Sequence, residues 1–314
     1  MASKTNDASM HAGETLPLGI DAPDSVVETG YRIRDVLTYS SAYLVFIAMI
    51  EVLTVHVVLS VPLNPAPVVV GLVAFAVYVG DRIADAETDE LATPERSAFV
   101  TRHRTILSIA TAVAYGIAVA LAVTGGPVAL AITLMPGAFW ILYASDWLPR
   151  VGAHVARLKQ VLVVNSAVVA LAWAIAVVGL PLAFADASVT PLAAVLFVYF
   201  LVDTFVNTEI PNVRDVEADA AIGVSTLPVV LGVGRTRRVL YGIDLALIGF
   251  VAVAFATGVV ATAVAAAILV GLGYALVVAA FVGRTTAFGR LEAASKLKHL
   301  VVFALVLVFM TLGI

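Results

Sequence analysis

Residues 160–184 read QVLVVNSAVVALAWAIAVVGLPLAF and contain no charged side chain. An α-helix of roughly 20 apolar residues crosses the hydrocarbon core of a bilayer, so this run is long enough to span a membrane. Membrane β-strands instead alternate in segments of about ten residues. The chain contains eight similar runs, near 39–61, 65–80, 105–125, 127–148, 189–209, 238–257, 259–283 and 298–314. The sequence therefore predicts an all-α, polytopic membrane helical bundle of nine transmembrane helices.

The composition of the 314 residues favours the same class of protein. Hydrophobic residues make up 61% and charged residues 13%, whereas an ordinary soluble domain has about 25% charged residues. The chain has no cysteine, which excludes disulfides, thiolate nucleophiles and cysteine metal sites. Its net charge is −4 without a basic stripe, so no nucleic-acid partner is expected. We expect residues 1–35 to form a flexible polar tail and residues 36–314 a single domain.

The basic residues predict the orientation of the bundle in the membrane. If nine helices alternate, all 18 Lys and Arg residues fall on one side, in the amino-terminal tail and after the second, fourth, sixth and eighth runs. Such residues concentrate in cytoplasmic loops. We therefore expect an integral protein of the cell membrane whose amino terminus and long loops are cytoplasmic and whose carboxyl terminus lies outside.

An acidic cluster follows the second apolar run. Residues 78–89 read YVGDRIADAETD, which places Asp81, Asp85 and Asp89 at i, i+4 and i+8. If the helix continues, all three carboxylates share one face. Like charges at this spacing repel one another, so a cation is expected among them.

A second acidic cluster follows the sixth run. Residues 212–223 read NVRDVEADAAIG, in which Asn212, Asp215 and Asp219 share a helical face and Glu217 points elsewhere. Both clusters lie at the cytoplasmic end of a predicted helix. Hard oxygen ligands of this kind suit Mg²⁺, which bridges carboxylates to substrate phosphates. The alternative is a pair of solvated acidic loops that offset nearby arginines.

These motifs carry a resemblance to a known family. Residues 212–232, NVRDVEADAAIGVSTLPVVLG, resemble the second aspartate-rich motif of the UbiA superfamily of intramembrane prenyltransferases. The first cluster, followed by TPER at 93–96, resembles the first motif, with Asp81 where the family usually has Asn. The resemblance covers roughly residues 30–314.

The resemblance implies a helical bundle with a lateral opening to lipid. It further implies that two Mg²⁺ ions bind the diphosphate of a polyprenyl donor, held by Asp81, Asp85, Asp89, Asn212, Asp215 and Asp219. Four of these carry the catalytic role: Asp81, Asp85, Asp215 and Asp219. Arg96 and Tyr143 match diphosphate contacts of the family, and Arg150 and Lys159 are expected to complete a cationic cap. The acceptor is lipophilic, and nothing in the sequence selects it.

Several ionisable residues lie inside predicted spans and leave alternatives open. Glu51 is a candidate base or acceptor contact, or else hydrogen-bonds a neighbouring helix. Asp203 and Asn207 are candidates to extend the second metal cluster. Together with Asp244, the buried acids also allow a cation-coupled transporter. A third possibility is a family member that binds a prenyl lipid without transferase activity.

Overall fold

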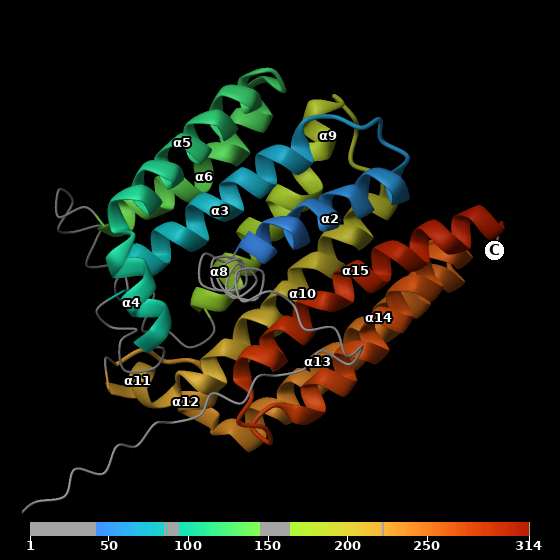
Figure 1. The fold of residues 1–314 in the computed structure, drawn as a ribbon. Helices are drawn as coiled ribbons and strands as arrows, with labels where there is room; N and C mark the ends of the chain where they lie inside the picture. Colours follow the sequence, from blue (N-terminus) through green and yellow to red (C-terminus); the bar gives the residue numbers. More distant parts are fainter. Residues whose placement is uncertain (1–41, 85, 87–93, 145–163, 222, 314) are drawn as a thin grey trace, which may run out of the picture.

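The computed structural model describes residues 42–84, 86, 94–144, 164–221 and 223–313. Within these ranges the chain is helical and contains no strand. Figure 1 shows the helices as a bundle of long rods, with shorter helices at one end. The long elements are α2 (Ala42–Leu59), α3 (Ala66–Ala84), α5 (Arg104–Val123), α6 (Gly126–Ala144), α8 (Val164–Ala174), α10 (Pro191–Arg214), α13 (Val233–Ala256), α14 (Thr262–Phe281) and α15 (Phe288–Leu312).

Helix α8 belongs to a longer apolar rod. It continues through the π-helical segment η2 (Ile175–Gly179) into α9 (Leu180–Phe184). This rod overlaps the run 160–184 from which the bundle was predicted.

Seven helices are long and apolar enough to cross a membrane, which confirms an integral, polytopic helical protein. They match seven of the nine predicted runs. The two other runs coincide with α2 and α6, whose apolar parts, Tyr43–Leu59 and Gly126–Ala138, are shorter. The number nine therefore stays a prediction.

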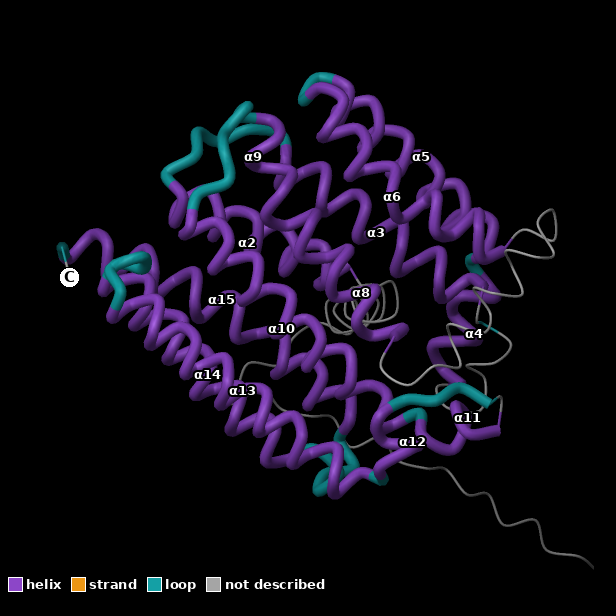
Figure 2. Tube along the Cα trace, turned by 180° about the vertical axis from the view of Figure 1, so that it is seen from behind, coloured by secondary structure: helices purple, strands orange, loops and turns teal. Residues whose placement is uncertain are grey.

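The bundle core lies where α2, α3, α10, α14 and the π-helical segment meet. Helix α3 packs against α2 and α5, and α15 packs against α2, α10 and α14. Viewed from behind, the short helices α4 (Pro94–Arg102), α11 (Val216–Ala221) and α12 (Leu227–Leu231) again gather at one end (Figure 2). The carboxyl end of α10 leads directly into this end.

Helix α10 shows how local sequence sets an element that carries the site. Thr190 caps its first turn by accepting a hydrogen bond from the Ala193 N–H at 3.2 Å, and Pro191 occupies the first helical position. Proline is favoured there because the missing N–H would have no partner within the helix. The helix ends at Arg214, where Asp215 adopts φ −92° and ψ 9°.

The last helix corrects one expectation. It begins at Phe288 instead of near residue 298, so Lys296 and Lys298 lie within α15 and not in a loop. Lys298 is only 1% exposed. A cation at this depth is tolerated because Asp203 of α10 forms an ion pair with it.

Candidate active site

The first acidic motif is only partly described. Asp81 lies in the last turn of α3, where it is exposed. Asp85 and Asp89 lie outside the described residues. The shared face predicted for the three carboxylates therefore stays a prediction.

The second acidic motif does not lie on one continuous helix, as the spacing had predicted. Helix α10 ends at Arg214, Asp215 follows as its cap, and Asp219 lies in α11. The backbone N–H of Asp219 donates to the carbonyl oxygen of Asp215 at 2.8 Å. This bond joins residues four apart, as in an α-helix, so Asp215 is the residue at which α10 ends and α11 begins, and Asp219 lies one turn further along α11. Glu217 is exposed.

Each polar member of the second motif has a neighbour that orients it. The Arg214 guanidinium donates two hydrogen bonds of 2.6 Å to the Asp215 carboxylate. The Asn212 amide donates to Glu209 Oε2 at 3.1 Å, and Glu209 in turn accepts a 2.6 Å bond from the Ser166 hydroxyl. Because the Asn212 N–H group is engaged, its amide oxygen is the atom that can bind a cation.

The electrostatics of the second motif favour a bound cation. Burial, together with the neighbouring Asp215 carboxylate, raises the pKa of Asp219 to about 6. A divalent cation would relieve this repulsion, and the amide and carboxylate oxygens are ligands that Mg²⁺ accepts. In the described ranges no three His, Asp or Glu side chains form a group that could hold a metal ion. The oxygen donors of the second motif fit Mg²⁺. Asp85 and Asp89, the other expected ligands, lie outside the described residues.

A cavity of about 1020 Å³ opens beside the second motif, between α2 and α15. One part of its wall is apolar and includes Phe46, Ile50 and Leu300. The other part is charged and comprises Arg82, Glu95, Arg96, Arg214, Arg290, Glu292 and Lys296. Arg96 thus lines the cavity, whereas the side chain of Tyr143 and all of Arg150 and Lys159 lie outside what the structure describes. A compartment of this size and mixed polarity suits an amphiphile with an anionic head.

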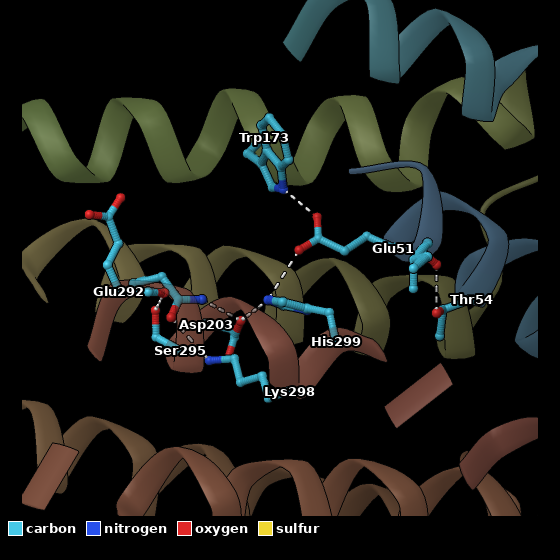
Figure 3. Close-up of polar contacts among 10 residues, drawn as sticks. Glu51, Thr54, Trp173, Asp203, Glu292, Ser295, Lys298 and His299 are labelled. Atoms are coloured by element: carbon cyan, nitrogen blue, oxygen red, sulfur yellow. Dashed lines mark hydrogen bonds and ion pairs between the residues drawn. The ribbon is translucent and has the colours of Figure 1, made fainter. Parts of the chain in front are cut away.

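A buried polar cluster joins the four helices α2, α8, α10 and α15 (Figure 3). The Glu51 carboxylate accepts a hydrogen bond from Trp173 Nε1 at 2.6 Å, and its Oε1 lies 3.1 Å from His299 Nε2. The same His299 nitrogen lies 3.3 Å from Asp203 Oδ2, and Lys298 pairs with Asp203. Glu51 therefore hydrogen-bonds a neighbouring helix, α8, which is one of the alternatives that the sequence left open for this residue.

The same cluster includes two polar residues of α10. Asn207 donates to Asp203 at 3.0 Å, and its amide oxygen lies 3.3 Å from Lys298 Nζ. Asp203 and Asn207 thus contact Lys298, and their part in the second metal cluster stays a prediction. Asp244 of α13 is fully buried, and no residue of the described part hydrogen-bonds its carboxylate oxygens.

Three members of the polar cluster were not predicted from the sequence as site residues, namely Trp173, Lys298 and His299. The available signal was the pair Lys298-His299 directly before an apolar run. An earlier start for the last helix would have placed both residues inside the bundle.

Comparison with known proteins agrees with this architecture. The model of a protein family described as the UbiA prenyltransferase family matches residues 43–300. No curated protein sequence shows a significant match. The solved structure of a digeranylgeranylglyceryl phosphate synthase is similar, with a TM-score of 0.57 and 12% identity over 88% of this chain and 98% of that one. The structure of a UbiA homologue from Archaeoglobus fulgidus bound to DMAPP and Mg²⁺ is also similar, with a TM-score of 0.56 and 14% identity over 87% of this chain and 99% of that one. At these identities the two structures show a shared fold.

Proposed function

Because the chain belongs to the UbiA prenyltransferase family, we propose that it is a Mg²⁺-dependent intramembrane enzyme that transfers an isoprenyl group from a polyprenyl diphosphate to a lipophilic acceptor. One observation carries this proposal. Arg214, which holds Asp215 of the second motif, also lines the large cavity between α2 and α15. The acidic motif and the substrate-sized compartment are therefore parts of a single site.

The proposed Mg²⁺ ligands are the oxygen donors of the two motifs: Asp81, Asp85, Asp89, Asn212, Asp215 and Asp219. We propose two ions, with Asp81, Asp85, Asp215 and Asp219 as the catalytic ligands. When bound, Mg²⁺ neutralises the charge that develops on a diphosphate leaving group. The Mg²⁺ and DMAPP bound to the similar Archaeoglobus fulgidus protein support this proposal.

The residues of the cavity wall supply binding and exclusion of water. Arg96 and Arg214 place guanidinium groups on its charged part, where a diphosphate would lie. Tyr143, Arg150 and Lys159 are proposed as further diphosphate contacts. The apolar side chains of Phe46, Ile50 and Leu300 would cover the isoprenyl chain and exclude water from an allylic cation.

The proposed orientation follows from the basic residues. The amino terminus and both acidic motifs would lie on the cytoplasmic side and the carboxyl terminus outside. The donor diphosphate would then reach the site from the cytoplasmic face, while its isoprenyl tail lies among the helices. The acceptor would enter from the surrounding membrane lipid.

The test is transfer by the purified chain in lipid nanodiscs with Mg²⁺, labelled geranylgeranyl diphosphate and a panel of lipophilic acceptors. Asp215→Asn removes the charge that would bind Mg²⁺, and we expect a loss of transfer of about 10²-fold or more. Glu217→Gln is the matched control, because this exposed acid lies in the same segment; it should retain activity within about twofold. Full activity in Asp215→Asn would overturn the site, and wild type that forms no product would overturn the function.

A further inference from the structure

We propose that the lipophilic acceptor carries an anionic head group, a carboxylate or a phosphate, and that the ammonium group of Lys296 binds it in the cavity. This acceptor class deepens the proposed function and depends on it. The observations that support it are the position of Lys296 in the cavity wall, the apolar residues around it and the charges closest to it.

Lys296 lies where the charged and the apolar parts of the cavity wall meet. The next two residues that α15 contributes to the wall are Leu297 and Leu300, and both are exposed. The charged residues Arg290 and Glu292 precede Lys296 on the same helix and line the same cavity. At a rise of 1.5 Å per residue, Lys296 lies about 9 Å further along the axis than Arg290. Lys296 is therefore the charged residue of the wall that lies furthest along α15.

The part of α2 that faces Lys296 is apolar. Helices α2 and α15 run in the same direction (Figure 1), and the contact of 3.1 Å between Glu51 Oε1 and His299 Nε2 sets their register. Lys296 precedes His299 by three residues, so it lies at a level about one turn before Glu51. The residues that α2 contributes to the wall around this level are Phe46, Ile47 and Ile50.

The Lys296 ammonium group has no anionic neighbour within the described part of the chain. No side chain there forms a hydrogen bond or an ion pair with it. The acid one turn before it, Glu292, lies 3.5 Å from the Arg214 guanidinium through its Oε2. Lys298, two residues further along α15, forms an ion pair with Asp203. Of these two lysines of α15, only Lys296 faces the cavity with its charge available to a ligand.

A lysine in such surroundings favours an anionic ligand. Cationic side chains inside a membrane protein are costly, and they are found paired or facing a cavity. The ammonium group offers three donors, and a hydrogen bond between two ionised groups is stronger than one between neutral groups. The apolar body of the same molecule would lie against Phe46, Leu297 and Leu300. The wall around Lys296 therefore fits an amphiphile with one anionic group.

The donor diphosphate has other contacts, nearer to the second acidic motif. Arg214 holds Asp215 of this motif and reaches α15 at Glu292. Glu292 precedes Lys296 by four residues, which is about 6 Å along the helix axis. A diphosphate bound at Arg214 and Arg96 thus leaves the ammonium group of Lys296 for a second anion. Lys296 would then hold the acceptor beside the donor.

The kinetic experiment compares acceptors with and without the anionic group, in nanodiscs of phosphatidylcholine with Mg²⁺ and geranylgeranyl diphosphate. The pairs are an alkylglycerol phosphate with its alkylglycerol, and a hydroxyphenyl carboxylate with its methyl ester. Wild type should use the anionic member of a pair with a kcat/KM at least about tenfold higher. Lys296→Met should raise the KM for that member about 10–100-fold and leave the KM for the donor and for the neutral member within about threefold.

Two further variants test the role of the charge. Lys296→Arg keeps the positive charge and should retain the preference for the anionic acceptor. Arg284→Gln is the matched control, because this exposed basic residue lies between α14 and α15 and outside the cavity wall. It should leave both KM values within about twofold. An unchanged KM of Lys296→Met for the neutral acceptor shows that the variant is folded.

A second measurement does not depend on transfer. A hexadecyl phosphate with a photoreactive diazirine in its chain, and the corresponding alcohol, are photolysed with the chain in nanodiscs while geranylgeranyl thiodiphosphate fills the donor site. The phosphate probe should label α2 and α15, and Lys296→Met should reduce this labelling about tenfold without changing labelling by the alcohol. Phosphatidylglycerol in the nanodisc should leave the labelling in place. If it abolishes the labelling, Lys296 binds ordinary anionic membrane lipid and the inference is overturned.

The remaining outcomes are also decisive. Wild type that uses both members of a pair equally, or only neutral acceptors, would overturn the inference, as would an undiminished preference in Lys296→Met. A rise in the donor KM of Lys296→Met would assign this lysine to the diphosphate and overturn it as well. Wild type that transfers to no acceptor overturns the proposed function instead, and the labelling then still decides whether Lys296 binds an anionic amphiphile.

Discussion

Replacing Lys298 by methionine tests whether the ion pair with Asp203 holds the bundle together. The two side chains are 2% and 0% exposed and belong to α15 and α10, so their charges depend on each other inside the protein. Methionine fills a similar volume and removes only the ammonium group. The change leaves two buried carboxylates, Asp203 and Glu51, around a single imidazole.

The expected cost follows from what Asp203 and Asn207 lose. Asp203 keeps the hydrogen bond from Asn207 at 3.0 Å and the contact with His299, but it loses the Lys298 ammonium group. Asn207 also loses its contact with the Lys298 ammonium at 3.3 Å. Removing one partner of a buried pair costs about 3–5 kcal/mol, and we expect a decrease of this size in the free energy of unfolding. A screened surface pair would cost less than about 1 kcal/mol.

The assay is reversible unfolding in mixed micelles, followed by circular dichroism. Lys296→Met is the control, since this lysine is on the same helix but lines the cavity; it should cost at most about 1 kcal/mol. In a double-mutant cycle of Lys298→Met with Asp203→Leu, the coupling energy should lie near the top of the range of roughly 0.5–3 kcal/mol. A loss below about 1 kcal/mol for Lys298→Met, with no coupling to Asp203, would refute the reasoning.

Two predictions concern the proposed Mg²⁺ site. Glu209→Gln removes the negative charge that strengthens the 3.1 Å hydrogen bond from the Asn212 amide, so Asn212 is oriented less firmly and the Mg²⁺ concentration for half-maximal transfer should rise about 10–100-fold. The exposed Glu217→Gln is again the control, and an unchanged Mg²⁺ titration in Glu209→Gln would contradict this role. Because the pKa of Asp219 is raised to about 6 without a cation, protons compete with Mg²⁺ below that pH and not above it. The apparent Mg²⁺ affinity should therefore fall by about tenfold per pH unit below pH 6 and stay level from pH 7 to 8, as measured by Mg²⁺ titrations of transfer. Equal affinity at pH 5 and pH 7.5 would contradict it.

The membrane helices were predictable because hydropathy is a local property of the chain. The run 160–184 and six others proved to be helices long enough to cross a bilayer, with only their ends misplaced. The last helix shows the limit. Lys296 and Lys298 resemble loop residues by charge, and only the position of Asp203 on another helix shows that Lys298 is buried.

The second acidic motif shows a different limit. Its residues and spacing were sufficient to indicate the family, since a motif is a property of the sequence alone. The spacing nevertheless predicted a continuous helical face, whereas α10 ends at Arg214. A new helix, α11, starts after Asp215 and carries Asp219, and this interruption cannot be read from a helical period.

The sequence by itself therefore determined the class of protein, the positions of most membrane helices and the acidic motifs of the family. Only the tertiary structure brought together Glu51, Trp173, Asp203 and His299, which come from four helices far apart in the chain. The physical reason is that each apolar helix forms from its own residues, whereas a buried charge is stable only beside the partner that helix packing brings to it.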